Sequence, residues 1–249
     1  RGPVGVGWGW GALGEAGRGE GTAEGPAEGT IATGVARPRG PEPLDGQRVV
    51  VTSGATTESV DPVRTLSNRA SGRTGRAVAR ACHTRGAEVV VVHDGPELPW
   101  ATVERVETAA EMSDAVLSHA DGADALVSAA AISDYTVQTA QSKLRSGQET
   151  VTLRLRPTSK LLDTVRAERP DLTMVGFKAE TDGDDTAIHE RARELQQRVG
   201  LSFVVGNDAG VMGETDTRAL LVDGDDHEVV EGSKTALGSR VADRLAAAL

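Results

Sequence analysis

The sequence has 249 residues and is acidic, with 37 Asp and Glu against 27 Lys and Arg and a net charge of −10. The acidic residues are spread along the chain, which argues against a general nucleic-acid-binding protein. One cysteine and five scattered histidines argue against an internal disulfide and against a zinc site. Since apolar runs stay below about 18 residues and the start lacks a signal region, we expect a cytoplasmic protein without a membrane span.

The first 44 residues differ from the rest in composition. They hold 13 of the 30 glycines, 5 of the 10 prolines and 2 of the 3 tryptophans, and almost no aliphatic run. Such a segment buries too little apolar surface to offset the entropy of ordering it. We therefore predict a Gly/Pro-rich, disordered linker at residues 1–44 and one domain at residues 45–249. The sequence starts at Arg1 and not at Met, which is expected of a fragment, a processed product or the tail of a longer polypeptide, and in the last case the linker would join this domain to another one upstream.

After residue 46, short β-branched runs alternate with helical stretches, which is typical of βαβ units around a mostly parallel sheet. Strands are predicted at residues 48–53, 88–93, 125–129, 173–177 and 202–206. Helices are predicted at residues 74–85, 109–120, 159–168 and 186–199, with Gly86 and Gly200 as C-terminal caps. The predicted fold class is α/β, a Rossmann-like doubly wound sheet.

Two segments depart from this alternation. Residues 132–156 contain an irregular stretch followed by an alternating strand at residues 150–156, which indicates an edge strand or a hairpin arm. Two short strands within residues 220–230 flank a turn at residues 223–226, ahead of a last helix at residues 234–249. We expect the first of these insertions to form a β-arm that serves as a lid or a dimer contact.

Small polar residues follow the first predicted strand and precede the first predicted helix. Small residues at a strand end let backbone amides approach a phosphate, and a helix N-terminus offers free amides to an anion. An ordinary turn, with an N-cap at Ser71 or Thr74, explains the same residues without a ligand. The candidate phosphate-binding residues are Ser53, Gly54, Thr56, Ser71 and Gly72.

The third predicted strand ends in a run of small residues that includes Ala130 and Ala131. Such a run leaves space for a planar ring against the backbone, which can read the edge of a base. Asp134 follows, where it could hold a metal ion or a ribose, although Asp is also a common loop residue.

Later polar residues fall at the same edge of the predicted sheet. Phe177 and Lys178 end the fourth strand and Asn207 follows the fifth. Lys143, in the irregular insertion, is a candidate mobile cation for a phosphoryl group in a chain with only four lysines. The alternative for Lys143 is an ordinary solvated surface lysine.

Taken in order, these segments resemble phosphopantothenoylcysteine synthetase, a ligase of coenzyme A biosynthesis. The resemblance covers residues 45–249 and is carried by residues 53–58, 61–64, 67–72, 129–135, 143, 176–181 and 207–208. Members of the family are often fused behind a flavin-dependent phosphopantothenoylcysteine decarboxylase. Residues 1–44 are too few and too glycine-rich to form that flavin domain, so we expect the upstream decarboxylase to be missing from this sequence or reduced to the linker. The resemblance implies a decarboxylase as a fused or associated partner.

The resemblance implies a two-step ligation. The carboxylate of 4′-phosphopantothenate attacks the α-phosphate of CTP in the presence of Mg²⁺, which gives an acyl-cytidylate and pyrophosphate. The amine of L-cysteine then displaces CMP. The resemblance also implies a homodimer in which the arm of one subunit completes the site of the other.

The resemblance assigns roles to individual residues. Lys143 corresponds to the lysine linked to formation of the acyl-cytidylate, and Asn68 to the asparagine linked to its turnover. Arg64 would fix a phosphate or orient the loop, and Asp134 matches the position that binds nucleotide and cation. The remaining nucleotide-site matches are Phe177 and Asn207, with Lys178 as a second cation.

Two departures from the family pattern leave the choice of nucleotide open. Leu195 and Val199 stand where bacterial members place lysines, although the same helix carries Arg191, Arg193 and Arg198. The basic motif at Lys143 is also short. Both features suggest an archaeal-type member, with ATP as an alternative to CTP.

Two other functions are compatible with this fold class. An NAD(P)-dependent oxidoreductase of the short-chain type would need Tyr-x-x-x-Lys, but Tyr135 is followed four residues later by Thr139. A noncatalytic nucleotide-binding regulatory subunit would need neither Asn68 nor Lys143, so the presence of both argues against it.

Overall fold

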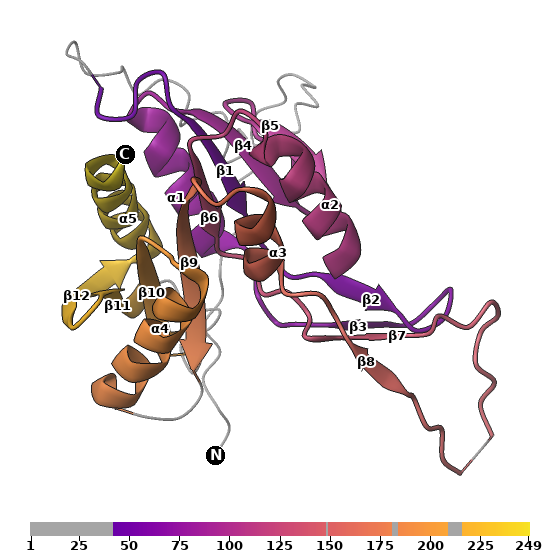
Figure 1. The fold of residues 1–249 in the computed structure, drawn as a ribbon. Helices are drawn as coiled ribbons and strands as arrows, with labels where there is room; N and C mark the ends of the chain where they lie inside the picture. The colour runs from indigo at the N-terminus through magenta and orange to yellow at the C-terminus, as the bar shows by residue number, and fades with distance from the viewer. Residues whose placement is uncertain (1–41, 148, 181–183, 209–215) are drawn as a thin grey trace, which may run out of the picture. The chain divides into compact units, whose positions relative to one another are not determined.

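The computed structural model describes residues 42–147, 149–180, 184–208 and 216–249, so the predicted linker lies almost entirely outside the described residues. The described chain forms an eight-stranded sheet in the order β12-β11-β10-β9-β6-β1-β4-β5 (Figure 1). The six strands from β5 to β10 in this order are parallel, and β11 and β12 are antiparallel. The strands are β1 Arg48–Thr52, β4 Glu88–His93, β5 Thr102–Arg105, β6 Ala125–Ser128, β9 Thr173–Glu180, β10 Phe203–Asp208, β11 Asp216–Asp223 and β12 Asp226–Ser233. The α/β prediction is confirmed.

Five helices cover the two faces of this sheet in the described part of the chain: α1 Arg73–Thr84, α2 Ala109–Ala120, α3 Leu161–Glu168, α4 Asp185–Val199 and α5 Lys234–Ala248. Side chains of β1 alternate between the faces, as strand geometry requires. Val49 and Val51 belong to the core cluster that includes residues of α1 and α5, whereas Val50 belongs to the cluster that includes residues of α2, α3 and α4. All three valines are at most 1% exposed, so each contributes about 1.5–3 kcal/mol of apolar burial. No helix within the described ranges is long and apolar enough to span a membrane.

The order of the strands places a topological switch point between β1 and β6. From β1 the chain moves outward to β4 and β5, and it then returns to β6 on the other side of β1. The chain stays paired beyond both strands, because Ala131 N donates to Gly54 O at 2.8 Å and Thr56 N donates to Ala131 O at 3.2 Å. In open α/β sheets, ligands bind outside the carboxyl ends of the strands at such a point.

Two short antiparallel ribbons project from this end of the sheet (Figure 1). They are β2 Thr57–Ser59 with β3 Thr65–Ser67, and β7 Tyr135–Val137 with β8 Leu155–Pro157; together with the residues between their strands we call them the arm. Buried Glu58 of β2 joins the two ribbons to each other and to α2, because its carboxylate accepts from Thr136 Oγ1 of β7 at 2.6 Å and from Ala109 N of α2 at 2.9 Å.

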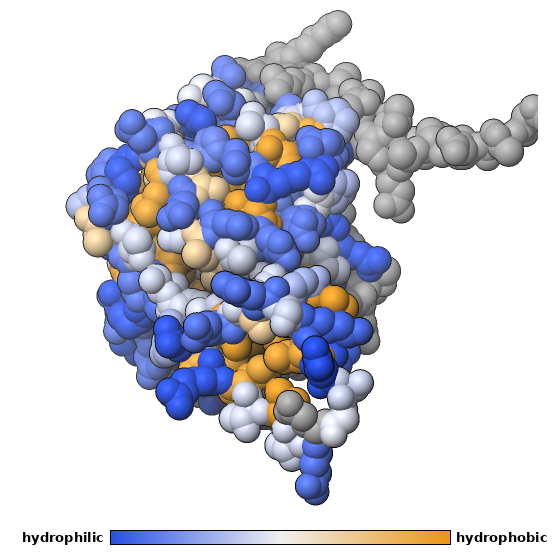
Figure 2. All heavy atoms as spheres, turned by 90° about the vertical axis from the view of Figure 1, so that its right-hand side faces the viewer, coloured by the Kyte–Doolittle hydropathy of each residue, from blue (hydrophilic) through white to orange (hydrophobic). Residues whose placement is uncertain are grey.

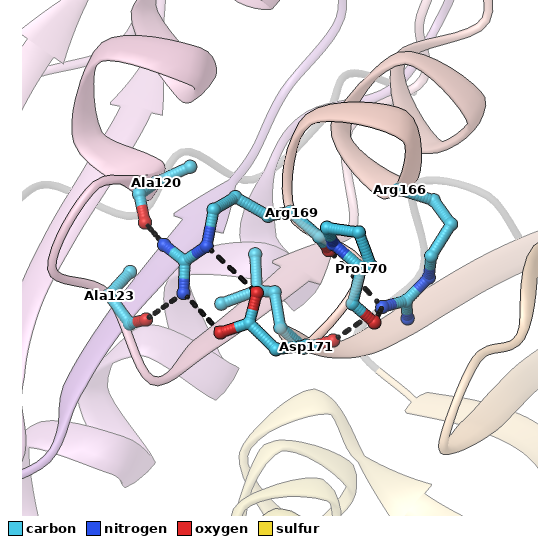
Figure 3. A network of polar contacts seen from close by, with 7 residues as sticks. Ala120, Ala123, Arg166, Arg169, Pro170 and Asp171 are labelled. Carbon is cyan, nitrogen blue, oxygen red and sulfur yellow. Dashed lines mark hydrogen bonds and ion pairs between the residues drawn. The ribbon is translucent and has the colours of Figure 1, made fainter.

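Two arginines of α3 and the turn after it bind backbone carbonyls at the other end of the sheet (Figure 3). Arg166 donates to Pro170 O at 2.7 Å, Leu172 O at 3.0 Å and Gly200 O at 2.8 Å. Arg169 donates to Ala120 O and Ala123 O and pairs with Asp171. Because α2 and α4 end at these carbonyls, the guanidinium groups cap both helices.

The structure corrects several details of the prediction. Of the strand expected at residues 150–156, residues 150–154 lie outside any strand, and Leu155–Pro157 pair only with the three-residue β7. The hairpin predicted within residues 220–230 is present but longer, with Gly224 in its turn at φ +61°. Four strands were not predicted: β2, β3 and β7, which are too short for a periodic signal, and the mostly polar edge strand β5.

Candidate functional site

A cleft of about 1210 Å³ opens at the carboxyl ends of the central strands. Its floor is formed by Gly54 beyond β1, residues 128–134 at the end of β6 and beyond it, residues 177–179 of β9 and Asn207 of β10. Its sides come from the segments that start α1 and α3, from one side of α4, and from the start of α5. The cleft therefore lies at the switch point, where the strand order places a ligand.

The structure brings most of the candidate residues together. Those that line the cleft are Gly54, Asn68, Ser71, Gly72, Ala130, Ala131, Asp134, Phe177, Lys178 and Asn207. Ser53 and Thr56 are fully buried behind its wall, where Ser53 Oγ donates to Gly72 O at 2.8 Å and Thr56 Oγ1 accepts from Ser133 N at 2.8 Å. Arg64 and Lys143 lie on the arm and do not line the cleft of their own chain. The chemical roles of all these residues stay predictions.

The first turn of α1 forms one wall of the cleft. Gly72 is its N-cap at φ +71°, and neither Ser71 nor Thr74 caps it with a side chain, so the alternative of an ordinary side-chain cap is wrong. A Cβ at Gly75 would lie 2.7 Å from that of Ser53, so only glycine lets the helix start this close to β1. The amides of this turn therefore face the cleft without a side-chain cap and can receive an anion.

The cleft is basic although the protein as a whole is acidic. Its described lining holds seven basic residues against the acidic Asp134 and Glu194: Arg69, Arg73, Lys160, Lys178, Arg191, Arg198 and Lys234. A basic cleft in a protein of net charge −10 indicates an anionic ligand. Lys160 and Lys234 were not among the predicted site residues. The scarcity of lysine is the signal that points to them, since three of the four lysines line this cleft.

Asn68 and Asp134 face the cleft from neighbouring segments. Asn68 Nδ2 donates to Ala131 O at 3.0 Å, which holds the carboxamide beside the residues beyond β6. The Asp134 carboxylate pairs with the Lys160 ammonium group, and the two side chains are 69% and 58% exposed. The backbone between them is fixed, because Thr158 N donates to Asp134 O at 3.0 Å. An exposed ion pair of this kind contributes at most about 1 kcal/mol, so a bound ligand can replace Asp134 as the partner of Lys160.

The carboxylates of the cleft fit a magnesium ion only in one mode. Among the described residues there is no group of three or more His, Cys, Asp or Glu side chains that could hold a metal. Magnesium is commonly bound by one or two carboxylates together with substrate phosphates. Asp134 fits that mode, and it would share the ion with a nucleotide.

Arg64 and Lys143 belong to a separate cluster on the arm. Arg64 Nη1 donates to Asp61 Oδ2 at 2.7 Å and to Leu144 O at 3.1 Å, and the Lys143 side chain is exposed. A hydrogen bond from the Leu144 amide holds the pKa of Asp61 below its ordinary value. The Val63 and Arg64 amides and the Arg64 charge add to this, while burial opposes it.

The sheet order, the switch-point cleft and its basic lining define a Rossmann-like α/β protein with a cleft suited to an anionic ligand. Residues 44–249 match the sequence model of the family described as "DNA/pantothenate metabolism flavoprotein C-terminal domain", and the chain belongs to this family. The family membership confirms the resemblance to phosphopantothenoylcysteine synthetases.

Relatives in archaea and bacteria are similar to this chain at nearly the same level. The "Coenzyme A biosynthesis bifunctional protein CoaBC" of Thermococcus kodakarensis is 39% identical over 187 residues, which cover 73% of this chain and 46% of the relative. The protein of the same name from Mycobacterium tuberculosis (strain ATCC 25618 / H37Rv) is 38% identical over 226 residues, covering 82% and 53%. The chain thus spans about half the length of these relatives.

Solved structures show the same fold. The DNA/pantothenate metabolism flavoprotein from Streptococcus pneumoniae has a TM-score of 0.74 at 20% identity, covering 82% of this chain and 100% of that one. A C-terminal domain of a CoaBC protein has a TM-score of 0.67 at 26% identity, covering 83% and 97%.

Proposed function

We propose that this chain is a phosphopantothenate–cysteine ligase that uses CTP and Mg²⁺. The observation that carries the proposal is the basic cleft at the switch point, in a member of this family, with Asn68 and Asp134 on its walls. A triphosphate, an α-phosphate that gains charge and a phosphorylated acid all need cations and free amides. The cleft offers cations, and the first turn of α1 offers backbone amides without a side-chain cap.

In the first proposed step, a carboxylate oxygen of 4′-phosphopantothenate forms a bond to the α-phosphorus of CTP, and the bond to the pyrophosphate oxygen breaks. The uncapped amides of α1 and the cleft cations Lys160, Lys178 and Lys234 bind phosphate oxygens and stabilise the charge that develops. Magnesium, when bound, supplies further neutralisation of the phosphate charge, with Asp134 as its protein ligand. Small residues at Ala130 and Ala131 leave room for the base.

In the second proposed step, the amine of L-cysteine attacks the acyl carbon and CMP leaves with the electron pair of the broken C–O bond. The amine loses a proton as the amide forms. Asn68 lies beside Ala131 on the cleft wall, where its Nδ2 can donate to the oxyanion of the tetrahedral intermediate. A carboxamide is suited to this role because it donates without titrating.

We also propose that the chain acts as a homodimer, because Lys143 lies outside the cleft of its own chain. The arm carries exposed apolar side chains, with Tyr135 51%, Val151 49%, Leu153 42% and Leu155 46% exposed. Figure 2 shows hydrophobic residues among hydrophilic ones on the lower part of the face toward which the arm projects. A second copy would cover them and bring each Lys143 to the partner's cleft. The half-length match to bifunctional relatives further suggests a fused or associated decarboxylase.

The proposal is tested with purified protein, 4′-phosphopantothenate, L-cysteine and each of the four nucleoside triphosphates in turn. Pyrophosphate release and the mass of the product are followed. We expect release with CTP, product only when cysteine is present, and an acyl-cytidylate that accumulates in Asn68→Ala. Lys143→Ala should form no acyl-cytidylate. Ligation at the wild-type rate by both variants would contradict the site assignment.

A further inference from the structure

Asp61 lies in the turn that joins β2 to β3, and its side chain has no exposed surface. Four hydrogen bonds reach its carboxylate. Oδ1 accepts from the backbone amides of Val63 and Arg64, both at 2.8 Å. Oδ2 accepts from Arg64 Nη1 at 2.7 Å and from the backbone amide of Leu144 at 3.0 Å. A buried carboxylate needs such partners, because a charge without them is costly to remove from water.

The two oxygens of Asp61 hold different parts of the chain. Oδ1 closes the local turn, as Asp side chains commonly do. Oδ2 reaches a residue 83 positions away in the other ribbon of the arm. Arg64 strengthens this second link by donating to Leu144 O at 3.1 Å, so both peptide groups of Leu144 are held. Oδ2 and Arg64 therefore form a clamp between the β2–β3 turn and residue 144.

The clamp acts directly on Lys143, because the amide that Asp61 binds belongs to the peptide bond between Lys143 and Leu144. The backbone at Lys143 is thus fixed, whereas its side chain is exposed. A cation on a fixed backbone searches a small region, which raises the fraction of time it spends at a reacting phosphate.

We propose that Asp61 is a positioning residue: through Oδ2 and Arg64 it holds the backbone at Lys143 where the lysine ammonium group reaches the nucleotide phosphates. This inference rests on the proposed function, which gives Lys143 its role in forming the mixed anhydride. It also places Arg64 among the groups that orient the loop and not among those that bind phosphate.

The substitution Asp61→Asn separates the two roles of the carboxylate. A carboxamide has one oxygen, so it can accept from the Val63 and Arg64 amides or from the clamp, but not from both. The hydrogen bonds of the local turn join neighbouring residues and so cost little loop-closure entropy, and we therefore expect the carboxamide oxygen to keep the turn. We expect trypsin to cleave after Lys143 and Arg145 about tenfold faster, as loss of a charge-assisted hydrogen bond implies.

The same variant should release pyrophosphate about tenfold more slowly at saturating nucleotide, with the Kd for CTP unchanged, since the cleft is intact. Asp114→Asn, at an exposed position of α2, is the matched control and should change neither rate. Asp61→Ala loses the turn as well, so its thermal unfolding midpoint should fall below that of Asp61→Asn. That order shows that the Asn variant is folded with its turn in place.

Two results would overturn the inference in a wild-type enzyme that ligates cysteine. One is unchanged tryptic cleavage in Asp61→Asn, which would show that the clamp does not hold the backbone at Lys143. The other is faster cleavage with an unchanged rate of pyrophosphate release, which would show that the clamp does not position Lys143 for the reaction. A wild-type chain that releases no pyrophosphate with any nucleotide removes the proposed function, and with it this role for Asp61.

Discussion

Lysine is rare in this chain, and most of its lysines lie at the cleft. Arginine outnumbers lysine by 23 to 4, yet Lys160, Lys178 and Lys234 all line the cleft. Lysine differs from arginine in presenting a compact, mobile charge that can move between partners. Lys160 is the clearest example, because it pairs with the exposed carboxylate of Asp134 and is available for exchange with a phosphate.

Lys160→Gln should weaken the binding of CTP roughly tenfold, because one charge-assisted hydrogen bond to a phosphate is lost. Lys160→Arg keeps the charge and should restore most of the affinity. Isothermal titration calorimetry at constant salt measures both Kd values. Equal affinity in the wild type and the Gln variant would show that the Lys160 ammonium group does not leave Asp134 for the nucleotide.

Asp61 also predicts how the arm responds to acid. Its pKa is lowered from 3.8, so the carboxylate stabilises the fold above pH 3.8. This contribution is lost as the pH falls through the lowered pKa. The unfolding free energy of the wild type should therefore exceed that of Asp61→Asn at pH 6, and the difference should shrink below pH 3.8. Urea unfolding at several pH values measures it, and a gap independent of pH would rule out this origin.

At the scale of the elements, the cleft depends on where α1 begins. Gly72 and Gly75 allow the first turn of α1 to pack against the end of β1, and no side chain caps the helix. Helix stability alone favours a Ser, Thr or Asp cap. In α1 such a side-chain cap is absent, so the backbone amides of its first turn can bind an anion.

Gly75→Ala should push α1 away from β1, because its Cβ would lie 2.7 Å from that of Ser53. We expect about 1–3 kcal/mol of lost stability and weaker binding of inorganic pyrophosphate. Gly122→Ala is the control, since its φ of +78° strains the backbone at the other end of the sheet. The control should lose about 1–2 kcal/mol and keep its affinity for pyrophosphate. Calorimetry and urea unfolding distinguish the two variants.

Arg166 has a structural role at the opposite end of the sheet (Figure 3). Arg166→Ala leaves the carbonyls of Pro170, Leu172 and Gly200 without their donor. The expected loss is about 2–4 kcal/mol of unfolding free energy, with little change in nucleotide binding. Arg105→Ala removes only an exposed pair with Glu97 and should cost less than about 1 kcal/mol. Equal losses in urea unfolding would contradict the capping role.

At the scale of the whole molecule, the proposed dimer makes a prediction that a monomer cannot meet. If each Lys143 serves the partner's cleft, a mixed dimer of Lys143→Ala and Asn68→Ala has one site with both residues. Random exchange of the two inactive variants should then restore about a quarter of the wild-type sites. Ligation is assayed after mixing and re-equilibration, with each variant alone as the control. No recovery, despite exchange shown by mass, would place Lys143 and Asn68 of one site on the same chain.

The sequence by itself determined the α/β class, the order of the main strands and helices, and the clusters at their carboxyl ends. Hydrophobic periodicity is local, and parallel strands necessarily bring their carboxyl ends to one edge. Short or polar strands such as β2 and β5 lack that signal, since pairing with β3 and β4 of the same chain creates them.

Only the tertiary structure decided which residues meet. In the structure, residues 150–154 form no strand, and Lys160 pairs with Asp134. Arg64 contacts Leu144 and lies outside the cleft. The physical reason is that side chains many positions apart interact through distances set by the sheet and the arm. Spacing along the chain does not encode those distances.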